Sequence, residues 1–136
     1  MTAVVLDSEA LNVLVRDLPG EQHVREWLVA AHRAGREVTV PAAVLAELYR
    51  TAGHEARVDS LLSRQRGVSI TDTDRYLARI IGRLLAAAGR GSEDHVDASA
   101  VAAAVIKGGG VVLTTDPGDL SAIAAGSAAV SIHKVG

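Results

Sequence analysis

The stretch HVDASAVAAAVIKGGGVVLTTD, residues 95–116, combines three local patterns that decide the fold. Its first part, 95–107, is rich in alanine and valine and predicts an apolar helix. The three glycines at 108–110 end that helix, and VVLTT at 111–115 predicts a short buried strand. A helix that passes through a tight turn into a buried strand is the repeating step of a parallel α/β sheet.

The same alternation of helices and short apolar strands extends over the whole chain. Strands are predicted at 2–6, 37–40, 68–71, 111–115 and 129–134. Helices are predicted at 7–17, 21–35, 41–51, 54–66, 73–88, 95–107 and 117–125. Pro41 is expected at the first position of its helix. The order βααβααβααβαβ indicates an α/β fold with a parallel sheet covered on both faces, and we expect residues 1–136 to form one domain.

The composition limits the chemistry that is open to the chain. Of its 136 residues, 49% are hydrophobic but only 2% are aromatic, so the core must consist of small and aliphatic side chains. The absence of cysteine excludes disulfides, thiolate catalysis and cysteine-based zinc sites. A net charge of −2 argues against a strongly basic nucleic-acid coat. We see no export signal and no apolar run of the roughly 20 residues that a membrane span needs, so we expect a cytoplasmic protein.

Acidic residues follow two of the predicted strands. Asp7 comes directly after 2–6 and Asp116 directly after 111–115. Each is either a helix N-cap or a ligand at the carboxyl edge of the sheet. If the two strands are neighbours, the two carboxylates meet. Asp97 lies at the start of the helix that leads into the fourth strand, which places it at the same edge.

The helix at 95–107 begins with more acid than capping needs. Asp94 and Asp97 are three residues apart, so they extend the same helix face and repel each other unless a cation lies between them. An N-cap accounts for one of them, whereas a metal accounts for both, and oxygen ligands favour Mg²⁺ or Mn²⁺ over zinc. Glu47, the only charge in VPAAVLAELY at 40–49, borders an apolar stripe and joins these acids only if its helix reaches the same edge.

Four acidic motifs together resemble those of PIN-domain ribonucleases, specifically VapC-type toxins. They are Asp7 in VVLDSEAL, Glu47 in VLAELYR, Asp97 in VDASAVAAA and Asp116 in VLTTDPGDL. The resemblance spans nearly the whole chain and implies a three-layer α/β/α sandwich with a central parallel five-stranded sheet of order 3-2-1-4-5. It also implies an endoribonuclease that hydrolyses RNA phosphodiester bonds with Mg²⁺ and a metal-activated water. The cation would be held by Asp7, Asp97 and Asp116, while Glu47 ligates it or orients the water.

Further polar residues are candidates for supporting these ligands. Asp94 and Asp119 are metal ligands themselves, acids that assist the ligands, or ordinary residues of a helix start. Thr114 and Thr115 either hydrogen-bond a ligating carboxylate or simply suit a strand as β-branched residues.

Basic residues in YRTAGHEARVDSLLSRQR, at 49–66, are candidates for RNA contacts. They are Arg50, His54, Arg57, Arg64 and Arg66. They either contact phosphates or form a solvated charged face. The few aromatic residues limit base recognition by stacking. The resemblance further implies a cognate VapB-type antitoxin and a homodimer. Because no apolar run is long enough for a membrane span, we expect no membrane partner.

Two other functions fit part of the pattern. A receiver-like phosphoacceptor domain would find partial counterparts in Asp72, Asp74 and Lys134, but Glu47 and Asp97 would then have no role. A non-catalytic PIN-like binding module is disfavoured because all four acids are present. Magnesium-dependent cleavage distinguishes these functions from one another.

Overall fold

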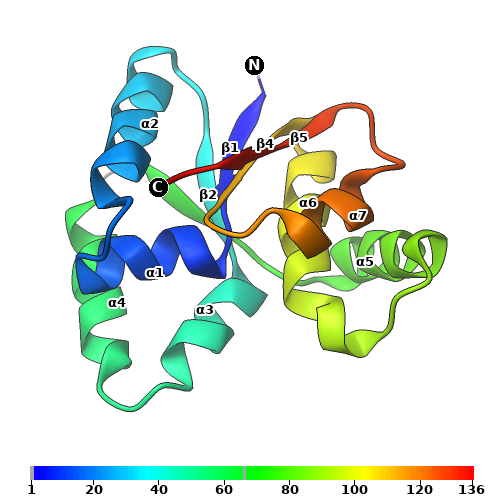
Figure 1. Cartoon of the computed structure of the whole chain (residues 1–136), viewed down its shortest axis with the longest axis horizontal. Coiled ribbons are helices and arrows are strands. Elements are labelled where there is room, and N and C mark those ends of the chain that lie inside the picture. The colour runs from blue at the N-terminus through cyan, green and yellow to red at the C-terminus, as the bar shows by residue number, and fades with distance from the viewer. Residues whose placement is uncertain (1, 66) are drawn as a thin grey trace.

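Five short parallel strands form the centre of the molecule (Figure 1). The computed structural model describes residues 2–65 and 67–136, so Arg66, a candidate RNA contact, lies outside the described residues. The strands are β1 (Ala3–Leu6), β2 (Val38–Pro41), β3 (Val68–Thr71), β4 (Gly110–Thr114) and β5 (Val130–Lys134). They lie in the order β3-β2-β1-β4-β5 and every neighbouring pair is parallel, which confirms the expected sheet.

The central position of β1 bears directly on function. β1 lies between β2 and β4, with Val5 opposite Val112 and Leu6 opposite Leu113. Sheets of the receiver type have the order 2-1-3-4-5 instead, so the topology excludes the receiver-like alternative. The carboxyl ends of β1 and β4 are adjacent, and the segments that follow them therefore start side by side.

Helices cover both faces of this sheet. One layer contains α1 (Ser8–Arg16), α2 (Glu21–Arg33), α3 (Ala42–Tyr49) and α4 (His54–Arg64). The other contains α5 (Arg75–Ala88), α6 (His95–Ile106) and α7 (Gly118–Ala124). Val4 and Leu6 pack into the first layer and Val5 packs into the second, because successive strand residues point to opposite faces. The three-layer α/β/α sandwich is confirmed.

Helix α6 is the most buried helix and carries the acids at its start. Every residue from Ala98 to Ala104 is buried, and the helix packs against β1, β4, α5 and α7. A helix that is apolar all round must be enclosed in this way. α6 has only 12 residues, and within the described ranges no helix is both long and apolar enough to cross a membrane.

Pro41 corrects one of the predicted boundaries. It is the last residue of β2, opposite Thr71, and not the first residue of a helix. A proline φ near −65° suits both a helix and an extended chain, so the pairing of β2 with β3 decides its ψ of 143°. The helix expected at 73–88 begins at Arg75, because the Asp74 side chain caps it.

The three glycines at 108–110 let α6 turn directly into β4. Gly109 has a φ of +119°, a conformation that side-chain-bearing residues rarely adopt. A β-carbon at Gly110 would lie 2.4 Å from the Ala3 carbonyl oxygen, so only glycine allows β4 to approach β1 this closely. The turn therefore determines how the two central strands meet.

Candidate active site

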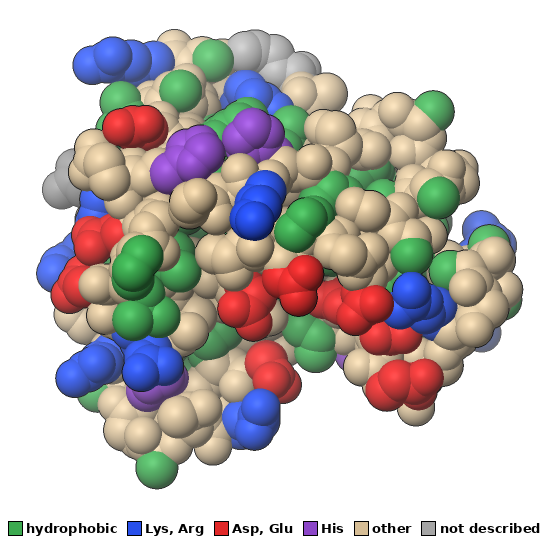
Figure 2. All heavy atoms as spheres, in the orientation of Figure 1, with side chains coloured by type: hydrophobic (Ala, Val, Ile, Leu, Met, Phe, Trp, Pro, Cys, Tyr) green, Lys and Arg blue, Asp and Glu red, His purple; other side chains and the backbone are tan. Residues whose placement is uncertain are grey.

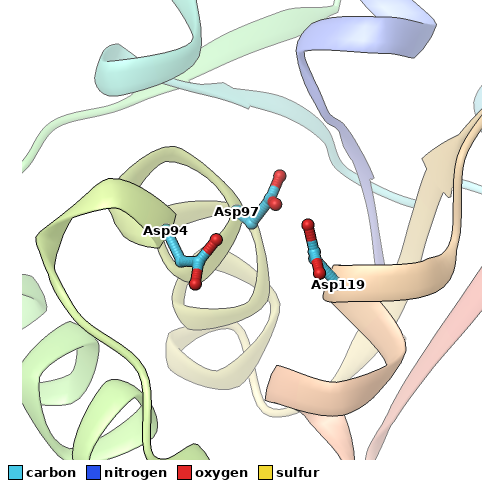
Figure 3. A group of neighbouring side chains, drawn as sticks. All are labelled: Asp94, Asp97 and Asp119. Atoms are coloured by element: carbon cyan, nitrogen blue, oxygen red, sulfur yellow. The ribbon is translucent and has the colours of Figure 1, made fainter.

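Three aspartates point toward one another at the carboxyl edge of the sheet (Figure 3). Asp94 ends the 3-10 turn η1 (Ser92–Asp94), Asp97 lies in the first turn of α6 and Asp119 lies in the first turn of α7. One carboxylate oxygen of each lies within 4.8 Å of the others. We call these three residues the aspartate cluster. Figure 2 shows acidic side chains gathered in a band over the starts of α1, α6 and α7.

Asp97 is the electrostatic centre of this acidic surface. It is half-buried, and this burial is the main reason why its pKa is raised above the ordinary value. The further contributions come, in decreasing order, from the negative charges of Asp119, Asp94, Asp116 and Glu9. Four neighbouring carboxylates therefore act on Asp97, which is the environment expected of a site that attracts a cation.

Asp7 is both a helix cap and a neighbour of Asp97. Its Oδ1 accepts a hydrogen bond from the Ala10 N–H at 2.8 Å, and the residue is 2% exposed. Burial raises the pKa of Asp7 to about 7, although the Ala10 N–H and the Thr114 hydroxyl act in the opposite direction. The charges of Glu9 and Asp97 raise it further. The two interpretations of Asp7, cap and site residue, are therefore compatible.

Asp116 lies in an exposed turn that Thr114 organises. The Thr114 hydroxyl accepts from the Asp116 N–H at 3.0 Å, and its proton has two acceptors in reach, the Asp116 carbonyl at 3.2 Å and the Asp7 carboxylate. The Asp116 side chain accepts from the Gly118 N–H at 3.4 Å. Thr115 donates to Glu9 Oε2 at 3.4 Å. The two threonines thus connect the turn after β4 with acids at the start of α1.

Glu47 lies apart from the aspartate cluster. It lines a hollow of about 170 Å³ together with Glu9, Arg16 and His54. Arg50 Nη2 lies 2.8 Å from Glu47 Oε1, and this hydrogen bond is the main reason why the pKa of Glu47 is lowered. Glu47 therefore approaches the other acids on the side of Glu9 and already has a positive partner of its own.

A family model described as the PIN domain matches residues 4–126. The chain belongs to the PIN domain family. Its structure is similar to that of VapBC2 from Rickettsia felis bound to a promoter DNA fragment, with 14% identity over 98% of this chain and 99% of that chain and a TM-score of 0.68.

Two further solved structures share the fold of this PIN domain. DNA-bound VapBC from Salmonella typhimurium is 19% identical over 98% of each chain, with a TM-score of 0.67. VapBC-5 from Mycobacterium tuberculosis, a member of the VapBC family of toxin-antitoxin systems, is 24% identical over 99% of this chain and 100% of that chain, with a TM-score of 0.55. Comparison with curated proteins gives no match.

Arg90 is a site residue that the sequence reasoning missed. It lies between α5 and η1, and its Nη1 donates to Asp119 Oδ1 at 2.7 Å and to Asp94 Oδ2 at 3.4 Å. These two hydrogen bonds raise the pKa of Arg90. Its position four residues before Asp94 was a usable signal, but its contact with Asp119 depends on the fold. Glu9 was also missed as a site residue, although it lies only two residues after Asp7.

The donor atoms of this PIN domain suit a divalent cation. The side chains that converge are carboxylates, and their oxygens are the ligands preferred by Mg²⁺ and Mn²⁺. The pKa values of Asp7 and Asp97 are raised by burial and by the charges of neighbouring acids, and a cation would offset both effects.

The candidate RNA contacts lie beside the hollow next to Glu47. Arg50 is paired with Glu47, and His54 lines the hollow. Arg57 is exposed on α4. Arg64, at the end of α4, donates to the Ser60 carbonyl at 3.3 Å. Arg57 is therefore the candidate whose substitution disturbs the acids least.

Substitution of Asp7 should change how stability depends on pH. The native pKa of about 7 lies above the value of about 3.9 expected in the unfolded chain, so between these pH values the native state binds a proton that the unfolded state has lost. This stabilisation is complete below about pH 4 and is lost as the pH rises to about 7. Asp7→Asn keeps a capping oxygen but cannot ionise, so the variant does not lose stability in this way as the pH rises. Urea denaturation in EDTA should show the variant gaining roughly 2–4 kcal/mol relative to wild type between pH 4.5 and 7.5.

Asp74→Asn is the matched control for this experiment. Asp74 caps α5 by accepting from the Leu77 N–H at 2.8 Å, but it is exposed. Its variant should follow the wild-type pH dependence. If the curve of Asp7→Asn also runs parallel to that of wild type, burial does not control the ionisation of Asp7.

Proposed function

We propose that this PIN domain is a Mg²⁺-dependent endoribonuclease and the toxin of a type II toxin–antitoxin pair. One observation carries the proposal: carboxylate oxygens of Asp94, Asp97 and Asp119 lie within 4.8 Å of one another beside the ends of β1 and β4, and the charge of Asp97 acts on Asp7 while that of Asp116 acts on Asp97. The similarity to solved VapBC structures supports the assignment as a toxin. Action on cellular RNA would place the protein in the cytoplasm.

The proposed ligands of Mg²⁺, or of Mn²⁺, are Asp7, Asp97 and Asp116, with Asp94 and Asp119 as supporting acids. When bound, the cation supplies Lewis acidity toward the scissile phosphate and toward a water molecule. The contribution of the protein is to hold several carboxylates at one point before the substrate arrives. Asp7 Oδ1 accepts the Ala10 N–H, which leaves Oδ2 as the oxygen that would hold the cation. Burial raises the pKa of Asp7 to about 7, and a bound cation would favour its ionised form.

Glu47 is proposed to ligate the cation or to orient the attacking water. Arg50 binds its Oε1 and lowers its pKa, so Glu47 is ionised at neutral pH. Its Oε2 is left to accept a hydrogen bond from water in the hollow shared with Glu9. An ionised carboxylate in this position can also accept a proton from that water.

Asp97→Asn should abolish cleavage of RNA. The purified chain is incubated with total cellular RNA in Mg²⁺ or in EDTA, and the fragments are separated by electrophoresis. We expect discrete fragments from the wild type in Mg²⁺ only, and a rate at least about a hundredfold lower for Asp97→Asn, because the substitution removes a negative ligand from the centre of the site.

Asp72→Asn is the control for this loss of charge, because Asp72 is exposed after β3 and outside the aspartate cluster. It should cleave like the wild type. A folded wild-type chain that neither cleaves RNA nor binds Mg²⁺ in calorimetry would refute the nuclease proposal. Binding of Mg²⁺ without cleavage would favour the non-catalytic PIN-like binding module.

We further propose that Arg50, His54 and Arg57 contact RNA phosphates. Arg57→Ala, made in the inactive Asp97→Asn background, should weaken binding of unrelated single-stranded RNAs to similar extents, and the salt dependence of the association constant should become less steep by about one unit. Fluorescence anisotropy at several salt concentrations measures both effects. Arg79→Ala, an exposed arginine of α5, is the control and should change neither. Equal effects of the two substitutions would argue against specific binding of RNA along α4.

The proposed protein partners are a VapB-type antitoxin and a second copy of this chain. The solved structures that share the fold are VapBC complexes, which supports the antitoxin. An apolar hollow lined by Ile80, Leu84, Val105 and Ile123 supports a homodimer, because apolar surface of this kind favours association. Light scattering of the partner-free chain should give about twice its mass of 14.1 kDa. A monomeric mass at micromolar concentration would contradict the homodimer.

A further inference from the structure

Arg90 is the one basic side chain that the described part of the structure pairs with the aspartate cluster. Its Nη1 lies 2.7 Å from Asp119 Oδ1 and 3.4 Å from Asp94 Oδ2. The side chain is 29% exposed, against 60% for Asp119 and 14% for Asp94. One guanidinium therefore binds two of the three carboxylates whose oxygens lie within 4.8 Å of one another.

The backbone holds Arg90 in place beside these acids. Gly89 ends α5 in a left-handed conformation with φ +66°, and the Arg90 N–H donates to the Leu85 carbonyl at 2.8 Å. This C-terminal cap directs the next side chain away from α5. The result is a link between three segments, namely the end of α5, η1 with the start of α6, and the start of α7.

The charge of Arg90 offsets repulsion that the cluster would otherwise suffer. Asp119 and Asp94 both raise the pKa of Asp97, so their negative charges act on Asp97 even with Arg90 present. A divalent cation held by Asp97, with Asp94 and Asp119 as supporting acids, would draw on some of the same oxygens and would itself be repelled by the guanidinium. Asp119, the more exposed partner, is the carboxylate whose bond to Arg90 can be exchanged most easily.

We propose that Arg90 is an internal counter-cation that competes with the divalent metal for the aspartate cluster. This inference rests on the proposed function, because it requires that a divalent cation binds there. Arg90 pairs with Asp119 and Asp94 in the metal-free protein, and entry of the metal displaces it from Asp119. Arg90 thus lowers the affinity for the metal and stabilises the metal-free fold.

The test compares Mn²⁺ binding to four proteins stripped of metal with EDTA and then dialysed. They are the wild type, Arg90→Gln, Arg90→Lys and Arg79→Gln. Arg79→Gln is the matched control, because it removes the same charge from an exposed position of α5 that lies outside both the aspartate cluster and the apolar hollow. Calorimetry gives the association constant, and thermal unfolding with and without Mn²⁺ gives a second measure that needs no RNA.

We expect Arg90→Gln to raise the Mn²⁺ association constant roughly three- to tenfold and to lower the melting temperature without metal. Arg90→Lys and Arg79→Gln should stay within about twofold of the wild-type constant. An unchanged or weakened affinity in Arg90→Gln would overturn the inference while leaving the proposed metal-dependent nuclease intact. Binding by Arg90→Gln alone would support it, whereas absence of Mn²⁺ binding in all four proteins would overturn both proposals.

A measurement on the wild type covers the case in which Arg90→Gln does not fold. In ¹⁵N-labelled protein, the Arg90 Nε–H signal is identified by its absence from Arg90→Lys. Titration with Mg²⁺ should shift or broaden this signal over the same concentrations at which the metal binds, while other arginine Nε–H signals remain in place. An Arg90 signal that is unaffected at saturating Mg²⁺ would overturn the inference.

Discussion

The parallel pairing of β1 with β4 is the constraint on which the rest of the site depends. Val5 lies opposite Val112, so both strands end at one edge and continue side by side into α1 and the turn before α7. This approach requires Gly110, since a β-carbon there would lie 2.4 Å from the Ala3 carbonyl oxygen. Helix α6, buried from Ala98 to Ala104, packs on the same two strands and begins at the same edge. The acids meet because of this geometry, although they are far apart in the sequence.

The concentration of negative charge at this edge opposes folding. Burial, with smaller contributions from the charges of Glu9 and Asp97, raises the pKa of Asp7 to about 7, and burial together with four neighbouring acids raises the pKa of Asp97. Capping of α1 and α6 needs one acid each, and the Asp94 side chain does not even cap α6. Ionisable groups that are perturbed in this way are concentrated at functional sites, which favours a role in binding over a role in stability.

The sequence predicts the fold, and it predicts the edge of the sheet at which Asp7 and Asp97 lie, because both follow from local patterns. The alternation of helices and strands indicates a parallel sheet, and the position of Asp7 and Asp97 relative to their elements indicates the edge at which they lie. The pairing of Arg90 with Asp119 could not be predicted in this way, since it joins residues 29 apart through the path of a loop. The separation of Glu47 from the aspartate cluster likewise depends on how α3 packs and on its ion pair with Arg50.

Two arginines divide the acids of the site into two groups. The carboxylates that Arg90 and Arg50 bind are Asp94, Asp119 and Glu47. In residues 2–65 and 67–136, the site acids without a Lys or Arg partner are Asp7, Glu9, Asp97 and Asp116. An arginine and a divalent cation both stabilise the ionised form of a carboxylate that lies among other acids. Asp7 has no such partner and, with a pKa of about 7, is partly protonated at neutral pH. A bound cation would therefore offset the most repulsion in the second group. This group contains the three acids that the family resemblance assigns to the metal.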